Sequence, residues 1–195
     1  YTNQFLRGLV RRHEATGAFM GDLAKSWEIS EDGLTVTFHL RQGIKWSDGE
    51  PFTAEDVKFT FKMMSLPGLG GNNWGGNFKP YVKGMTEWMA GDADDIEGIR
   101  VVDDFTVAYD LIRPFAMDVL GLAFNLIYIA PEHTLKEYLD REKAPDILQS
   151  EWATTAKHVG LGPFRVVEYV PDQYIIYEPY EDYHRGKPRL GRLIY

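Results

Sequence analysis

The sequence predicts an α+β fold in which most strands are antiparallel and helices flank the sheets. Three observations lead to this prediction. Stretches of alternating apolar and polar residues come in pairs joined by short turns, as in hairpins. One segment has the start signals and spacing of an amphipathic helix. Finally, the 195-residue chain has no internal repeat, and its 44% hydrophobic and 26% charged residues are typical of a globular protein with its own core.

The clearest strand is expected at residues 34–40, where Leu, Val, Phe and Leu alternate with Thr, Thr and His. The Glu-Asp-Gly turn at residues 31–33 makes residues 27–29 the expected antiparallel partner. After a glycine, residues 44–46 resume an extended run, which the Ser-Asp-Gly turn at residues 47–49 ends. This region therefore predicts a hairpin followed by a short strand.

A helix is expected to begin at Thr53. The Thr53 hydroxyl can cap the first turn, and Asp56 occupies the reciprocal position of a capping box. Val57 and Phe61 fall on one face of this helix and predict its buried side. The Pro-Gly pair at residues 67–68 ends it.

The remaining elements are predicted from the same signals. They are a hairpin of residues 98–102 and 105–111, a short helix from Pro114 to about residue 123, a helix to residue 139 with Pro131 at its first position, and a hairpin of residues 164–170 and 174–180.

The composition argues against several classes of function. Twenty-one basic residues against 29 acidic ones give a net charge of −8, whereas a nucleic-acid partner needs a concentrated basic face. The chain has no cysteine, which excludes disulfides, thiolate metal sites and cysteine nucleophiles. No apolar stretch approaches the roughly 18 residues of a transmembrane helix.

Motifs of catalysis and cofactor binding are missing as well. The chain has neither a P-loop nor a Gly-x-Ser-x-Gly elbow, and its five histidines lack metal-ligand spacing. The acidic run at residues 92–97 resembles a calcium loop, but Glu97 stands where that loop requires glycine, so a solvated turn is expected. We therefore expect a protein that is not an enzyme and holds no cofactor or metal.

Trp74 is the aromatic residue that core periodicity does not explain. It lies in a loop rich in glycine and asparagine, at residues 68–76. Because loops often carry function, a ligand-facing tryptophan is one interpretation. The other is a lid packed on its own domain.

Residues 23–57, LAKSWEISEDGLTVTFHLRQGIKWSDGEPFTAEDV, resemble the signature region of a known family. It is the family of extracellular solute-binding proteins of ABC importers, in the peptide, oligopeptide and nickel branch (family 5). Further blocks resemble the same family in the same order: VDDFTVAYDLIRPFAMDVLGLA (102–123), VGLGPFRVVEY (159–169) and YHRGKPRL (183–190).

The resemblance implies a lobe of the periplasmic-binding-protein type II kind, with mostly antiparallel or mixed sheets and flanking helices. Residues 1–195 would be a truncated part of the first lobe, without the second lobe and the returning strands. Apolar residues at both ends favour truncation over an ordinary frayed terminus, since no cap or turn precedes the first group and the last group begins a strand that stops. They are Phe5, Leu6, Leu9 and Val10 at the start, and Leu190, Leu193, Ile194 and Tyr195 at the end.

The implied function is capture of peptides or similar small solutes in a cleft between two lobes, followed by delivery to the membrane permease of an ABC transporter. The expected location is the periplasm or the cell surface, with a lipid anchor in the full-length protein as one option. Two loops resemble segments that line the cleft. They contribute Asn73 and Trp74 after the first helix, and Phe124 and Asn125 before residues 129–131. Trp27 and Trp46 are expected to be scaffold.

Several alternatives remain open. An extracellular ligand-sensing domain would have the same fold, and a hydrolase on this scaffold would need a nucleophile motif that the sequence lacks. The sequence does not decide whether the solute is a peptide, an opine, a sugar or a metal chelate. The longer acidic connection at residues 81–95 has no assigned role.

Overall fold

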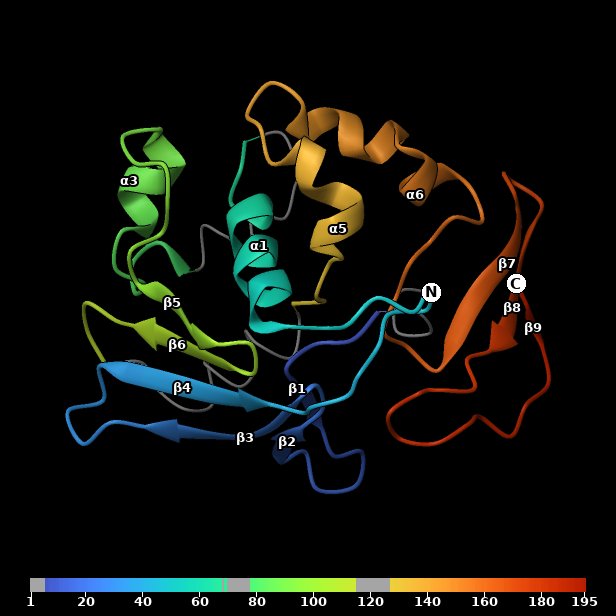
Figure 1. Cartoon of the computed structure of the whole chain (residues 1–195), viewed down its shortest axis with the longest axis horizontal. Coiled ribbons are helices and arrows are strands. Elements are labelled where there is room, and N and C mark those ends of the chain that lie inside the picture. The colour runs from blue at the N-terminus through green and yellow to red at the C-terminus, as the bar shows by residue number, and fades with distance from the viewer. Residues whose placement is uncertain (1–5, 68, 70–77, 115–126) are drawn as a thin grey trace.

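The structure is a computed structural model that describes residues 6–67, 69, 78–114 and 127–195. It contains a four-stranded sheet with helices on one face, and a short two-stranded hairpin lies near this sheet (Figure 1). A three-stranded sheet lies at the other end of the molecule. Every strand pair is antiparallel. The predicted α+β class is therefore confirmed.

The four-stranded sheet has the order β3-β4-β6-β5 and is built from two predicted hairpins. Strands β3 (Ala24–Ile29) and β4 (Thr35–Leu40) pair with Trp27 opposite Phe38, as expected. Strands β5 (Ile99–Asp103) and β6 (Thr106–Asp110) form the second hairpin, and β6 adds to β4. The alternation in β4 buries its apolar residues and leaves the polar ones partly exposed.

Helix α1 (Ala54–Met64) covers one face of this sheet, as Figure 1 shows. Thr53 is its N-cap, and the Thr53 N–H donates to the Asp56 carboxylate at 3.0 Å, so the predicted helix start is confirmed. Phe61 packs against Tyr109 of β6 with ring centroids 5.0 Å apart. Between the helix and the sheet lies the largest cluster of buried residues.

A second helix, α3 (Met85–Ala90), lies in the acidic connection and was not predicted. Its Trp88 is buried, and the indole N–H donates to Ser65 Oγ just after α1 at 2.8 Å. Lys62 of α1 lies 4.6 Å from the centre of the Trp88 ring. Contacts with α1 therefore hold this short helix in place.

The three-stranded sheet has the order β7-β8-β9. Strands β7 (Phe164–Val170) and β8 (Tyr174–Pro179) form the predicted final hairpin, and β9 (Leu193–Ile194) pairs with β8. Near the start of the chain, β1 (Val10–Arg12) and β2 (Phe19–Gly21) form a small hairpin, and β2 contacts β3.

The helix predicted for residues 131–139 is shorter than expected. Pro131 is extended and stands before the first turn, so α5 comprises only Glu132–Leu135. A 3₁₀ turn η2 (Lys136–Tyr138) follows, and then η3 (Ala144–Gln149) and α6 (Glu151–Thr154). The extended piece expected at residues 44–46 is an isolated bridge between Lys45 and Pro51 rather than a strand.

The helix predicted from Pro114 to residue 123 lies outside the described residues apart from Pro114 itself. Within the part of the chain that the structure describes, no helix combines the length and the apolar character that crossing a bilayer requires.

Candidate functional site

All four residues predicted to line a cleft, Asn73, Trp74, Phe124 and Asn125, lie outside the described residues. Their role therefore stays a prediction. The first described residue after each loop is buried. Phe78 follows the first loop and packs edge-on against Phe61 of α1, with ring centroids 5.1 Å apart. Ile127 follows the second loop and belongs to the same core cluster. The framework on which both loops end is thus well defined.

Residues 127–131 form an extended connector through the middle of the molecule, and we call them the central connector. The Ile129 N–H donates to the Arg7 carbonyl at 2.8 Å, and the Ala130 N–H donates to Thr60 Oγ of α1 at 2.9 Å. Ile129 packs in the main core, whereas Tyr128 packs against the cluster beneath the β7–β8 hairpin. The central connector therefore joins the packing of the two sheets.

Asp56 of α1 is the most connected carboxylate at this junction. Its side chain is buried and accepts three hydrogen bonds: from Trp46 Nε1 at 3.3 Å, from the Thr53 N–H at 3.0 Å and from the Glu132 N–H at 3.0 Å. Burial raises the pKa of Asp56 above its ordinary value, and the three hydrogen bonds only partly oppose this effect. Asp56 thus links Trp46, at the start of the turn before α1, to the first residues of α1 and of α5.

Trp46 is fully buried, so the expectation that it is scaffold is confirmed. Its carbonyl accepts a hydrogen bond from the Tyr180 hydroxyl at 2.9 Å, and the neighbouring Ser47 exchanges two hydrogen bonds with Gly160 at 3.0 and 3.1 Å. Asp48 pairs with His133 Nε2 at 2.8 Å. The turn at residues 46–49 is consequently fixed to both the three-stranded sheet and α5.

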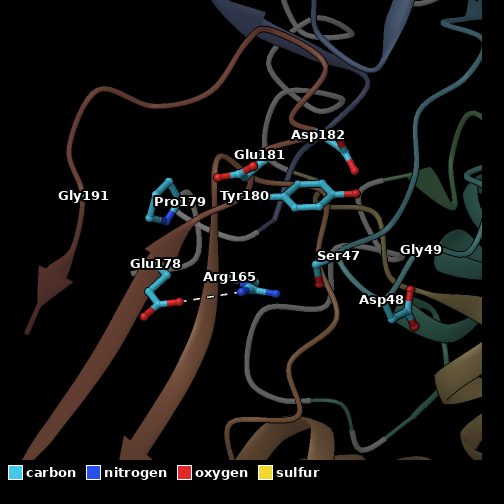
Figure 2. Close-up of a pocket in the computed structure, with 10 residues that line it drawn as sticks. All are labelled: Ser47, Asp48, Gly49, Arg165, Glu178, Pro179, Tyr180, Glu181, Asp182 and Gly191. Atoms are coloured by element: carbon cyan, nitrogen blue, oxygen red, sulfur yellow. Dashed lines mark ion pairs between the residues drawn. The ribbon is translucent and has the colours of Figure 1, made fainter.

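A hollow of about 620 Å³ opens beside this turn. Figure 2 shows Ser47 and Asp48 on one side and Arg165 and Glu178 on the other, with Tyr180 above them. Arg165 and Glu178 are paired across β7 and β8 at 3.6 Å, and both side chains are about half exposed. The remaining charged residues of the rim, Glu181 and Asp182, are acidic. The hollow is therefore polar, and its single arginine is already neutralised.

The acidic connection contributes a smaller cluster on the other side of α1. Asp95 accepts from Lys58 at 2.6 Å and from Lys62 at 3.2 Å. Burial would raise the pKa of Asp95, but the two lysines outweigh it and lower the pKa below its ordinary value. The turn expected at residues 92–97 is present, and one of its carboxylates holds α1 as well as facing water. Among the described residues, no group of histidine, aspartate and glutamate could hold a metal ion.

Comparison with known proteins identifies the family. Residues 18–195 match the sequence model described as "Bacterial extracellular solute-binding proteins, family 5 Middle". This chain belongs to that family. The resemblance that the sequence motifs indicated is therefore confirmed.

Among curated relatives, the chain is 33% identical to a dipeptide-binding protein of Escherichia coli over 96% of this chain and 34% of that protein. It is 36% identical to heme-binding protein A of Haemophilus influenzae over 88% of this chain and 30% of that protein. The chain thus spans about a third of the length of the curated relatives it matches.

Among solved structures, the chain is similar to a periplasmic oligopeptide-binding protein of Borrelia burgdorferi. The TM-score is 0.83 and the sequence identity 27%, over 100% of this chain and 37% of that one. This likeness confirms the expected periplasmic-binding-protein type II fold. The family is one of binding proteins.

The junction around Asp56 was not predicted as a centre of contacts, although the capping box that contains it was. A capping-box aspartate is usually a local feature, and the sequence gives no sign that residues 46 and 132 bind the same carboxylate. The apolar residues at the start of the chain were recognised, but the bond between Ile129 and Arg7 had no signal, because the two residues lie far apart in sequence.

Proposed function

We propose that this chain is part of the first lobe of a solute receptor that captures peptides or similar small solutes in a cleft between two lobes. The full-length protein then delivers the solute to the membrane permease of an ABC transporter, working in the periplasm or at the cell surface. The match to the solute-binding family over residues 18–195 carries this proposal.

The names of three relatives favour a peptide without fixing the solute, because two of them refer to peptides. Their names refer to a dipeptide, to heme and to an oligopeptide. The same lobe can thus be combined with different ligands, as is common for binding folds. In such receptors two lobes close around the solute, so that the closed state is stabilised by contacts that the open state lacks.

We propose that Asn73, Trp74, Phe124 and Asn125 contribute this lobe's contacts to the solute. The chemistry suits an extended peptide, since asparagine amides can bind its backbone groups and aromatic rings can pack on its side chains. The buried residues that follow the two loops, Phe78 and Ile127, support this role, because a binding loop works best on a fixed framework.

The first test is native mass spectrometry of the full-length protein, purified without denaturation. A ladder of bound masses that match short peptides supports a peptide receptor, and one sharp other mass assigns a defined small solute. A protein that carries no bound mass and binds neither peptide mixtures nor small solutes in titration would contradict the proposal.

The site residues are tested separately with the solute thus identified. Trp74→Ala and Asn125→Ala should each weaken binding about tenfold or more, as expected for the loss of a well-packed contact. Val102→Ala is the control, because Val102 is 56% exposed on the edge strand β5. Equal affinity of all three variants would remove these loops from the site without removing the receptor function.

A further inference from the structure

A second hollow, of about 440 Å³, differs from the one in Figure 2 by its charge. It lies between β1, the central connector and the loop after β8. Four arginines line it, against only two carboxylates, although the whole chain has a net charge of −8. We call it the arginine hollow; its charged residues are Arg7, Arg11, Arg12, Arg185, Asp22 and Glu14.

Two of these arginines are held in place by aromatic rings. The Arg7 guanidinium lies 5.4 Å from the centre of the Tyr183 ring, and that of Arg12 lies 5.1 Å from the centre of the Phe19 ring. Stacking on a ring orients the planar guanidinium and leaves its edge free to donate hydrogen bonds. The hollow is therefore partly preorganised.

One of the two carboxylates of the hollow, Asp22, is already paired. Asp22 is buried, pairs with His184 Nε2 at 3.1 Å and lies 3.6 Å from Arg7. Burial would raise the pKa of Asp22, but the hydrogen bond from His184 and the positive charge of Arg7 outweigh it and lower the pKa. With four arginines against two carboxylates, the lining keeps an excess of positive charge.

Two arginine donors in the hollow have no acceptor within the part of the chain that the structure describes. The Nε atoms of Arg7 and Arg11 are buried and have no hydrogen-bond acceptor among the described residues. In the same part of the chain, no carboxylate lies within 4.0 Å of the side-chain nitrogens of Arg11, Arg12 or Arg185. Buried polar groups in folded proteins are nearly always hydrogen-bonded, so these two donors can bind an acceptor that enters the hollow.

We propose that the arginine hollow binds a small oxyanion that carries carboxylate or phosphate groups. The guanidinium fork matches both groups in geometry and charge. The volume lies within the range of small-molecule sites, roughly 300–1,000 Å³. The hollow in Figure 2 lacks this property, because its arginine is paired with Glu178. The site is independent of the loops proposed to line the cleft, so either proposal can fail alone.

The test is isothermal titration calorimetry of the full-length protein with citrate and, separately, with inorganic phosphate, at constant ionic strength set by sodium chloride. Saturable binding of at least one anion is expected. The two titrations distinguish a carboxylate ligand from a phosphate ligand. Arg11→Gln and Arg185→Gln should each weaken binding about tenfold or more, as expected for the loss of a charge-assisted hydrogen bond.

The matched control is Arg192→Gln, which removes one exposed arginine outside the hollow. It should leave the affinity within about twofold of the original, because an exposed charge at a distance is screened by salt. Arg185 lies in a loop, so its variant should fold even if Arg11→Gln disturbs β1. Absence of binding of both anions to the full-length protein, or equal weakening by the control, would overturn the proposal.

Discussion

Replacing Asp56 by alanine should destabilise the protein by about 3 kcal/mol. The substitution removes three hydrogen bonds and leaves the buried donor of Trp46 and the partly buried donors of Thr53 and Glu132 without their acceptor. Each such bond contributes about 1–1.5 kcal/mol, which gives about 3–4.5 kcal/mol in total. Relief from burying a charge, which is what raises the pKa of Asp56, offsets part of this loss.

Urea unfolding followed by circular dichroism measures this change. For a chain of this size, about 3 kcal/mol corresponds to a fall in Tm of about 6–12 °C. Glu55→Ala is the control, because Glu55 is exposed in the same helical turn and should cost less than about 0.5 kcal/mol. If Asp56→Ala loses less than about 1 kcal/mol, Asp56 does not hold the junction together and the reasoning is wrong.

Three other substitutions test separate features. Gly84→Ala should lower the free energy of unfolding by about 2 kcal/mol or more in thermal unfolding, because φ is +75° and the new Cβ would lie 2.8 Å from a backbone nitrogen. Gly43→Ala, at φ +74° in open space, should cost only about 1 kcal/mol, and equal losses would refute the clash. Trp88→Phe should cost about 1–2 kcal/mol in urea unfolding through the lost bond to Ser65, and an unchanged midpoint would contradict this. Burial lowers the pKa of His158 below 6.5, so the contribution of neutral His158 to stability is present above pH 6.5 and is lost as the pH falls through the lowered pKa. His158→Gln should flatten this part of the stability–pH curve, and an unchanged slope would contradict this role of His158.

The hairpins could be predicted from sequence because their signals are local. In β4, the alternation that ends in Phe38 and Leu40 fixes which side is buried, and the preceding turn fixes the partner strand. The start of α1 was equally clear, since Thr53 and Asp56 are only three residues apart. In each case the residues that decide the structure lie within one element or its turn.

Helix α3 could not be predicted because its stability comes from distant residues. Six residues between Gly84 and Gly91 are too few for a helix that is stable alone, and Trp88 is held by Ser65 and Lys62 from α1. The helix expected to run from Pro131 to residue 139 ends instead at Leu135, because the backbone tightens there into the 3₁₀ turn η2. Sequence spacing does not reveal such tertiary effects.

The candidate site was predicted from two observations: a loop tryptophan that core periodicity does not explain, and the resemblance to a known family. Trp74 stood out because no periodicity explained it, whereas Asn125 was nominated only by the family pattern. The arginine hollow had no signal in sequence, because Arg7 and Arg11 come from the start of the chain and Arg185 from its end. Only folding brings these charges together.

The contacts around the central connector also determine the order in which the chain can fold. The β3–β4 and β7–β8 hairpins close over short loops and can form early. By contrast, the bond between α5 and α1 at Asp56 spans 76 residues, and the bond from Tyr180 to Trp46, which holds the end of β8 to the turn before α1, spans 134. Closing such long loops costs entropy before any contact repays it, so docking of the two sheets should be the slow, late step of folding. A ribosome-bound chain that ends before Tyr180 could form the first sheet but could not yet complete this docking.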